Sequence, residues 1–211
     1  QTKPDVAVFQ VSPMDEHGFF NFGPNASHMA AVCETSKVVI VEVNENMPVC
    51  FGGTEEGVHI SHVDMIVEGD NPAIAEMGGA AAASDVDEAV AKLILEEIPD
   101  GAVLSLGVGG VPFTVANMLA QSDKTDLGCH TGTISDAFLA LYKAGKLTNK
   151  KKEIDNGYST WNLAMGSQEL YDWLDNEPQL FHPADVDYVH SPYRIGEMKN
   201  VISINGGVEL D

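Results

Sequence analysis

The stretch AVLSLGVGGVPFTVANMLAQ, residues 102–121, decides the expected fold. Its first five residues, 102–106, are apolar except for Ser105 and predict a buried strand. A glycine-rich loop follows over 107–110, and then an apolar run in which Pro112 suits the first turn of a helix. Strand, loop and helix in this order are typical of an α/β fold with a mainly parallel sheet.

The glycine-rich loop has two interpretations. Gly107, Gly109 and Gly110 permit positive φ angles and let a ligand approach the backbone closely. Amide groups at the start of the following helix favour an anion or a developing oxyanion. The loop lacks the last spaced glycine of the dinucleotide-binding fingerprint, so a tight turn without a ligand is an equal alternative.

Upstream, the chain predicts a second α/β unit. Apolar runs at 5–12 and 37–44 indicate buried strands, and a helix over 28–36 with Ser27 as its cap lies between them. This order predicts a βαβ unit in a parallel sheet. The long segment from Glu45 to Gly79 is polar and has few periodic signals.

The small residues in GGAAAASDVDE, 78–88, indicate a seam between parts of two α/β domains, 1–80 and 81–211. Ser84 and Asp87 form a capping-box pattern at the start of a helix. The helical spacing of its aliphatic residues predicts a buried face made of Val86, Ala89, Val90, Leu93 and Ile94.

Alternating elements continue to the end of the chain. A helix over 138–145 closes at Gly145. The next four elements are expected to be a strand, a helix, a strand and a strand, at 159–166, 168–177, 186–192 and 200–206. The chain starts at Gln1 and ends in SINGGVELD, which is typical of an unfinished strand, so we expect an internal piece of a longer polypeptide.

Composition narrows the function. The chain has 211 residues, 44% of them hydrophobic, which suffices for one large domain or parts of two. Its formal charge of −21 repels nucleic acid and anionic lipid, so we expect neither as a partner. No apolar run approaches a membrane span and no leader is recognisable. The three scattered cysteines favour reduced thiols in a cytoplasm.

Other reactive side chains have ordinary explanations. His59 and His62 could share a metal, but nothing nearby completes a zinc pattern, so no metal is expected. Cys129 beside His130 would point to the opposite face of a strand, which favours a buried structural thiol. The basic cluster 150–152 is interpreted as a solvated loop, with phosphate contact as the alternative.

Several long stretches carry a family resemblance. They are VSPMDEHGFFNFGPNASHMAAVCETSKVVIVEVNENMP (11–48), GGTEEGVHISHVD (52–64), EGDNP (68–72), LGVGGVPF (106–113), DLGCHT (126–131), KAGKLTNKKK (143–152) and VISING (201–206). Together they resemble the acetyl-CoA hydrolase/transferase family, which includes butyryl-CoA:acetate and 4-hydroxybutyrate CoA-transferases. Family chains are about twice as long and hold two similar α/β domains. The resemblance implies that 1–80 ends the first domain and 81–211 starts the second.

This chain departs from the family's active-site signature, His-Thr-Glu, at one position. In the turn GCHTGTISDA, 128–137, His130 and Thr131 are present and Gly132 stands where the glutamate belongs. That carboxylate attacks an acyl-CoA thioester to give an anhydride and then a glutamyl-CoA thioester, from which a second acid takes the CoA. Asp136 is better explained as a first-turn acid of the next helix. We therefore expect this chain to lack transfer activity.

The resemblance also implies the remaining site. The N–H groups of Val108 and Gly109 would face the oxyanion, and CoA would contact Gly109, Gly110, Val111, Pro112, Phe113 and Gly206. The implied activity moves CoA between a short-chain acyl-CoA (butyryl, 4-hydroxybutyryl or acetyl) and a carboxylic acid such as acetate. An acyl-CoA hydrolase and a catalytically dead acyl-CoA-binding protein are the alternatives. Family members imply a homo-oligomer in the full-length form.

Overall fold

The strand, loop and helix predicted from residues 102–121 are all present. The computed structural model describes residues 3–53, 55–77 and 83–206. Strand β6 (Val103–Leu106) leads through the loop into helix α3 (Gly110–Gln121). Gly109 caps the helix at a φ of 149°, a conformation that side chains beyond glycine rarely adopt. The sharp exit from the strand therefore depends on this glycine.

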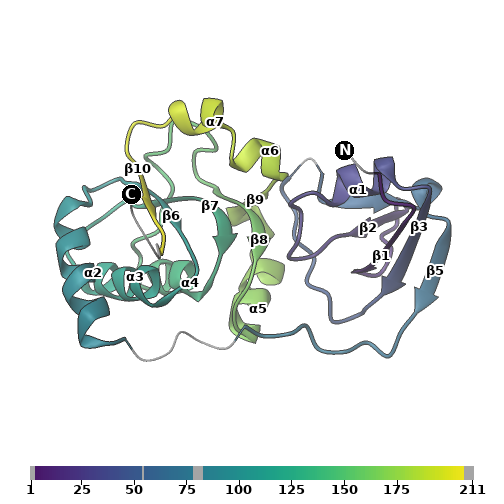
Figure 1. The fold of residues 1–211 in the computed structure, drawn as a ribbon, viewed down its shortest axis with the longest axis horizontal. Coiled ribbons are helices and arrows are strands. Elements are labelled where there is room, and N and C mark those ends of the chain that lie inside the picture. Colours follow the sequence, from purple (N-terminus) through teal and green to yellow (C-terminus); the bar gives the residue numbers. More distant parts are fainter. Residues whose placement is uncertain (1–2, 54, 78–82, 207–211) are drawn as a thin grey trace.

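Strand β6 lies inside a five-stranded sheet in which every neighbouring pair is parallel. In spatial order the strands are β10 (Val201–Ile204), β6, β7 (Gly128–Ile134), β8 (Ser159–Ala164) and β9 (Phe181–Pro183). Figure 1 shows helices α2 to α5 on one side of this sheet and α6 and α7 on the other. Cover on both faces is what an all-parallel sheet requires.

The helices around this sheet begin and end at recognisable signals. Their bounds are α2 (Asp85–Glu97), α4 (Asp136–Lys143), α5 (Gln168–Asn176), α6 (Val186–Val189) and α7 (Pro192–Gly196), with a 3-10 turn η2 (Pro178–Leu180). The capping box predicted for α2 is confirmed, because Ser84 and Asp87 bond each other's backbone N–H. Gly145, at a φ of 70°, follows the end of α4 as predicted.

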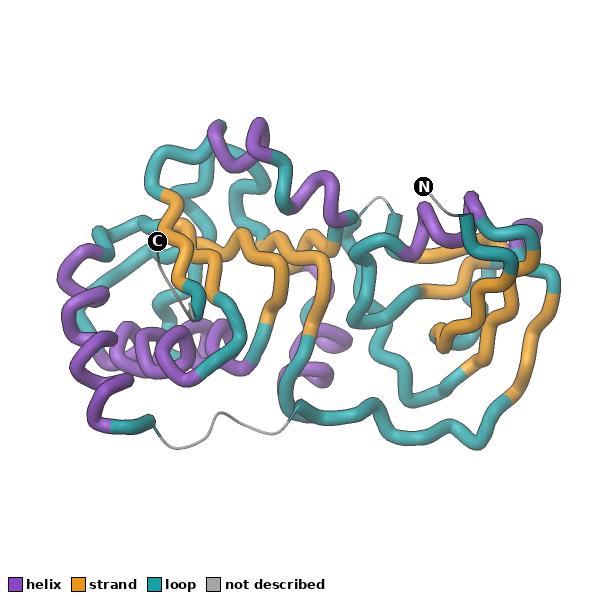
Figure 2. Tube along the Cα trace, in the orientation of Figure 1, coloured by secondary structure: helices purple, strands orange, loops and turns teal. Residues whose placement is uncertain are grey.

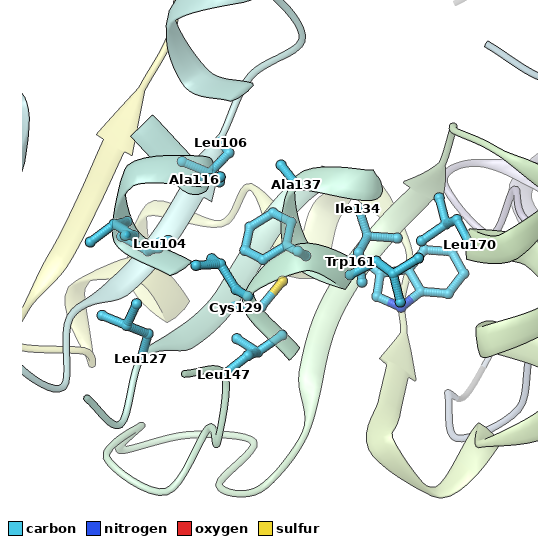
Figure 3. Close-up of a cluster of buried hydrophobic side chains, with 14 of the residues drawn as sticks. Leu104, Leu106, Ala116, Leu127, Cys129, Ile134, Ala137, Leu147, Trp161 and Leu170 are labelled. Atoms are coloured by element: carbon cyan, nitrogen blue, oxygen red, sulfur yellow. The ribbon is translucent and has the colours of Figure 1, made fainter. Parts of the chain in front are cut away.

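The core of the larger sheet is aromatic at the β8 and β9 side. Trp161 is fully buried, and its ring lies 6.5 Å from that of Phe181. Trp173 of α5 packs edge-on against Phe181 at 4.8 Å and stacks on Tyr142 of α4 at 4.7 Å. Figure 3 shows Trp161 beside Ile134 and Leu170, in the same apolar layer as Cys129.

A smaller parallel sheet is built by the first part of the chain. Its strands, in spatial order, are β1 (Val6–Val11), β3 (Val38–Val43) and β5 (Met65–Glu68). Helix α1 (Met29–Thr35) connects β1 to β3, which confirms the predicted βαβ unit. An antiparallel pair, β2 (Phe19–Asn21) with β4 (Gly57–His59), and the 3-10 turn η1 (Ile60–His62) complete this region.

The two sheets are joined along strand β8. Where the short strand β9 ends, residues 24–26 take its place: Ala26 donates to the Asn162 carbonyl at 3.0 Å, and Ala164 donates to the Pro24 carbonyl at 2.7 Å. Figure 2 shows the tube of the first region meeting the larger sheet at this side. The first region thus covers the edge that β9 leaves open.

Three local predictions are wrong. Residues 186–192 are not a strand, since Asp185 caps α6 by accepting the Tyr188 N–H at 2.7 Å. Ser27 does not cap α1, because its hydroxyl bonds the Asn25 side chain and α1 begins without a side-chain cap. Residues 128–134 of the expected active-site turn form strand β7. The turn is confined to the residues that follow.

The predicted burial of two elements is also wrong. In α2, Val86 is 69% exposed and Leu93 68% exposed, whereas Ala91 and Ile98 are buried. The helix carries aliphatic residues nearly all round, and small Ala91 allows it to pack against α3. Strand β1 is only half buried, since Val8 points to solvent. Residues 78–82 and 207–211 of the predicted seam and final strand lie outside the described residues.

Taken together, the elements confirm the predicted α/β class with mainly parallel sheets. Within the described ranges, no helix combines the length and apolarity needed to cross a bilayer.

Candidate active site

A cavity of about 400 Å³ lies on the larger sheet, on the side that α6 and α7 cover. It is lined by Ser105, Leu106, Gly107, His130, Thr131, Gly132, Thr133, Asn162, Val189, His190, Ile195, Val201, Ser203 and Asn205. None of these lining residues is an aspartate, glutamate, lysine or arginine. In a chain with a formal charge of −21, this is a neutral, donor-rich surface that suits a carbonyl or an anion.

Strand β7 contributes four of the lining residues, 130–133. Side chains alternate along a strand, so His130 and Gly132 share a face while Cys129 points into the opposite core. Burial raises the pKa of the Cys129 thiol to about 12, which leaves it protonated and unreactive. The expectation of a buried structural Cys129 is confirmed.

An imidazole occupies the space beside Gly132. A Cβ atom built on Gly132 would lie 2.9 Å from both Cε1 and Nε2 of His190. His190 follows α6 directly, and its backbone N–H donates to the Val186 carbonyl at 3.0 Å. The position of the family's glutamate therefore faces a histidine that is 58 residues further along the chain.

The second imidazole, His130, is fixed in one tautomer. Its Nε2 lies 2.8 Å from the Val189 carbonyl oxygen, and a carbonyl can only accept, so Nε2 carries the proton. Nδ1 is then a bare acceptor; it is buried and has no partner among the described residues. Burial lowers the pKa of His130 and keeps the ring neutral.

A buried lysine lies below the cavity, contrary to the expectation that residues 150–152 form a solvated loop. Lys150 and Lys151 are exposed, as a solvated loop requires, but Lys152 is only 3% exposed. Its Nζ donates to the carbonyls of Cys129 and Tyr158 and to the hydroxyl of Thr160, at 2.7–2.9 Å. Burial lowers the pKa of Lys152 to about 8. This lysine is part of the interior and not of a phosphate-binding surface.

Thr160 links Lys152 to a hydrogen-bonded cluster that is centred on the Asp155 carboxylate and lies under α6. The Thr160 hydroxyl donates to Asp155 at 2.8 Å, and the other Asp155 oxygen accepts from Tyr188 at 2.9 Å and lies 3.1 Å from His182 Nδ1. Burial alone would raise the pKa of Asp155, but these hydrogen bonds outweigh it and hold the pKa well below its usual range. Tyr188 belongs to α6, so the cluster anchors the helix that positions His190.

The glycine loop borders the cavity through Gly107. The Gly107 N–H donates to the Ile204 carbonyl at 2.8 Å and is not available to a ligand. The N–H groups of Val108 and Gly109 have no backbone or side-chain partner among the described residues. Val108 is 62% exposed, so the free amides at this turn are open to solvent.

The other predicted CoA-contacting residues lie at different depths. Pro112 is buried in α3, while Val111 and Phe113 are partly buried and pack on the core. Gly110 faces the Asp87 carboxylate, since a Cβ on Gly110 would lie 3.3 Å from it. Gly206 is exposed just beyond Asn205, which lines the cavity. None of these five residues lines the cavity itself.

Among the described residues, no carboxylate lines the cavity, and the candidate acid and metal ligands elsewhere have other partners. The Asp136 carboxylate bonds the N–H and hydroxyl of Ser167 at 3.0 and 2.6 Å, and so joins α4 to α5. His59 caps η1 by accepting the Ser61 N–H. Over the residues that the structure describes, no three His, Cys, Asp or Glu side chains are grouped to hold a metal.

Sequence reasoning missed His190 and the cluster below it. Asp185 before VDYV is a helix cap signal, and Ser191-Pro192 starts α7 in the same way. Asp185 directly precedes the residues expected to form a strand, and Ser191-Pro192 lies within them. Had these signals been used, His190 would have been placed at the junction of two short helices.

An open parallel α/β sheet, with a glycine loop entering a helix and a polar cavity beside it, is an architecture in which α/β proteins commonly bind ligands. Comparison with known proteins is more specific. The family profiles of the acetyl-CoA hydrolase/transferase N-terminal and C-terminal domains match residues 1–77 and 166–211. The chain belongs to the acetyl-CoA hydrolase/transferase family.

The chain is similar to several named proteins over nearly its whole length. The butyryl-CoA:acetate CoA-transferase of Anaerostipes caccae is 58% identical over 98% of this chain and 46% of its own length. The solved 4-hydroxybutyrate CoA-transferase of Porphyromonas gingivalis has a TM-score of 0.89 at 35% identity, over 98% of this chain and 51% of that one. RipA from Yersinia pestis has a TM-score of 0.86 at 38% identity, over 95% and 44%. The chain spans about half the length of these relatives.

Proposed function

We propose that this chain is the part of a CoA-transferase that holds an acyl-CoA thioester in the cavity between the glycine loop and α6. In family members with the glutamate, the activity would move CoA between a short-chain acyl-CoA, such as butyryl-, 4-hydroxybutyryl- or acetyl-CoA, and a carboxylic acid such as acetate. The likeness to the butyryl-CoA:acetate enzyme supports this choice of substrates. The neutral lining of the cavity is compatible with a thioester carbonyl.

In this proposal the free N–H groups of Val108 and Gly109 donate hydrogen bonds to the developing oxyanion. The backbone from Gly109 to Phe113, together with Gly206, contacts CoA. CoA carries several negative charges and the chain's own charge is −21, so capture must rely on local donors. Unpaired amides at the start of α3 supply such donors.

The single observation that carries the proposal is Gly132. Covalent transfer needs a carboxylate at this position, and no lining residue offers one. The chain would therefore bind acyl-CoA without forming a glutamyl-CoA thioester. The proposal has four further parts. Residues 1–80 and 81–211 are pieces of two domains, and the protein is cytoplasmic. It binds no metal and forms a homo-oligomer at full length.

The test is Gly132→Glu, made in this chain and in a version completed to the length of its relatives. We expect CoA exchange with ping-pong kinetics and inactivation by borohydride in the presence of acyl-CoA, because a glutamyl thioester is reducible. His190 must turn aside to admit the new side chain, so Gly132→Glu combined with His190→Ala is the relieved version.

Thr133→Glu is the matched control. Thr133 also lines the cavity, but its side chain starts one residue further along β7, so a carboxylate there is displaced from position 132 and should not support exchange. Equal exchange rates in the Gly132 protein and the Gly132→Glu variant would contradict the assignment, since another residue would then be the nucleophile.

A further inference from the structure

The cavity has no carboxylate at position 132 but has the imidazole of His190 beside it. The ring of His190 lies where the side chain of residue 132 would start, with Nε2 2.9 Å from that point. We propose that His190 is a general base that activates water, so that this chain hydrolyses acyl-CoA thioesters instead of transferring CoA. This inference rests on the proposed acyl-CoA site and assigns a different reaction to it.

The composition of the cavity singles out one proton acceptor. Apart from its two histidines, the lining offers hydroxyls, amides and aliphatic groups, none of which takes up a proton near neutral pH. His130 is unsuited, because its Nε2 already carries a proton and its acceptor Nδ1 is buried, in a residue that is only 2% exposed. His190 is exposed at the cavity and can return its proton to solvent.

Three contacts fix the backbone that carries this imidazole. Tyr188 ties α6 to Asp155, His130 ties the Val189 carbonyl to β7, and the His190 N–H is bonded to Val186. The residues just before His190 are therefore fixed to strand β7 and to the loop that holds Asp155. A base that must meet a water molecule within hydrogen-bond reach benefits from such a fixed backbone.

The reaction balances without a further reagent. A water oxygen attacks the thioester carbonyl while His190 Nε2 takes one water proton, and the carbonyl π electrons move to the oxygen that faces Val108 and Gly109. Collapse of this intermediate breaks the carbon–sulfur bond and expels the CoA thiolate. The thiolate receives the proton from His190, so the products are one carboxylic acid and one CoA thiol.

The experiment measures thiol release from butyryl-CoA with a thiol-reactive dye, in the Gly132 protein and in His190→Gln. We expect release above the buffer rate in the Gly132 protein and a loss of about 100-fold or more in the variant, the usual contribution of a general base. His17→Gln, an exposed histidine in a loop outside the cavity, should release thiol at the unchanged rate. Imidazole added to His190→Gly should recover part of the rate.

Binding separates the two proposals. Titration with unreactive desulfo-CoA should give the same affinity in the Gly132 protein and in His190→Gln, and thermal melts should show both folded. Binding without thiol release, or release that survives His190→Gln, would overturn the hydrolysis proposal alone. Failure to bind desulfo-CoA would remove the acyl-CoA site, and the hydrolysis proposal with it.

Discussion

The two parallel sheets differ in burial, although β1 and β3 of the smaller sheet are more apolar than β7 and β8 of the larger one. In the larger sheet, Leu104 and Trp161 are fully buried between helices on both sides. In the smaller sheet, Val8 is 65% exposed and Met65 56% exposed, because helix α1 covers only part of it. An apolar β-branched run therefore specifies a strand, while burial depends on which helices the rest of the chain provides.

The largest effect expected from this difference is on the free energy of unfolding, and two phenylalanines, one buried and one half exposed, test it. Phe138 of α4 is fully buried under the larger sheet, and Phe19 of β2 is 47% exposed. Phe138→Ala should lower the free energy of unfolding by about 3–5 kcal/mol. Phe19→Ala should lower it by about 1 kcal/mol, since half of the ring is already in water. Urea unfolding followed by circular dichroism measures both, and equal losses would refute the comparison.

An intermediate effect is expected at Lys152, with Lys37 as the exposed counterpart. Lys152→Met leaves buried carbonyls without donors and should cost about 1–3 kcal/mol at pH 7. Lys37 is 77% exposed beside Asp5, and Lys37→Met should change stability by about 0.5 kcal/mol or less.

The pH dependence of stability sharpens the lysine comparison. The pKa of Lys152 is lowered by burial to about 8 in the folded chain, from 10.5. Between these pH values the unfolded chain binds more protons at this site, so stability due to Lys152 rises with pH across the interval. The rise should be absent in Lys152→Met and retained in Lys37→Met. The same change in the free energy of unfolding between pH 7.5 and pH 9.5 in all three proteins would contradict it.

The smallest effect compares two serines before helices. Ser84 caps α2 with a bond to the Asp87 N–H, and Ser84→Ala should cost about 1 kcal/mol. Ser27 does not cap α1, so Ser27→Ala should have less effect on stability. Thermal melts of both variants test the difference, and a larger loss for Ser27→Ala would show that the α1 boundary is misassigned.

Local sequence signals predicted most of the fold. Strand β6, the loop and α3, the βαβ unit and the α2 capping box all follow from patterns within about 30 residues. Strand β5 was missed because its four residues are stabilised by pairing with β3, a distant partner. The buried face of α2 was misassigned because the choice between its two aliphatic sides is made by α3.

The site was predicted only as far as the resemblance reached. Gly132 and the glycine loop lie in recognisable stretches, so their importance could be proposed from sequence. His190 and Asp155 carry no motif, and their roles come from α6 folding back over β7 and β8. Contacts between residues this far apart along the chain are set by topology and cannot be read from a local pattern.

The aromatic cluster around Phe181 has a spectroscopic consequence. Trp161 and Trp173 are the chain's two tryptophans, and both lie in the core of the larger sheet. Intrinsic fluorescence therefore reports the loosening of that sheet and is nearly silent about β1, β3 and β5. Far-UV circular dichroism records both sheets at once. The gap between the midpoints of the two signals measures directly how independently the smaller sheet melts.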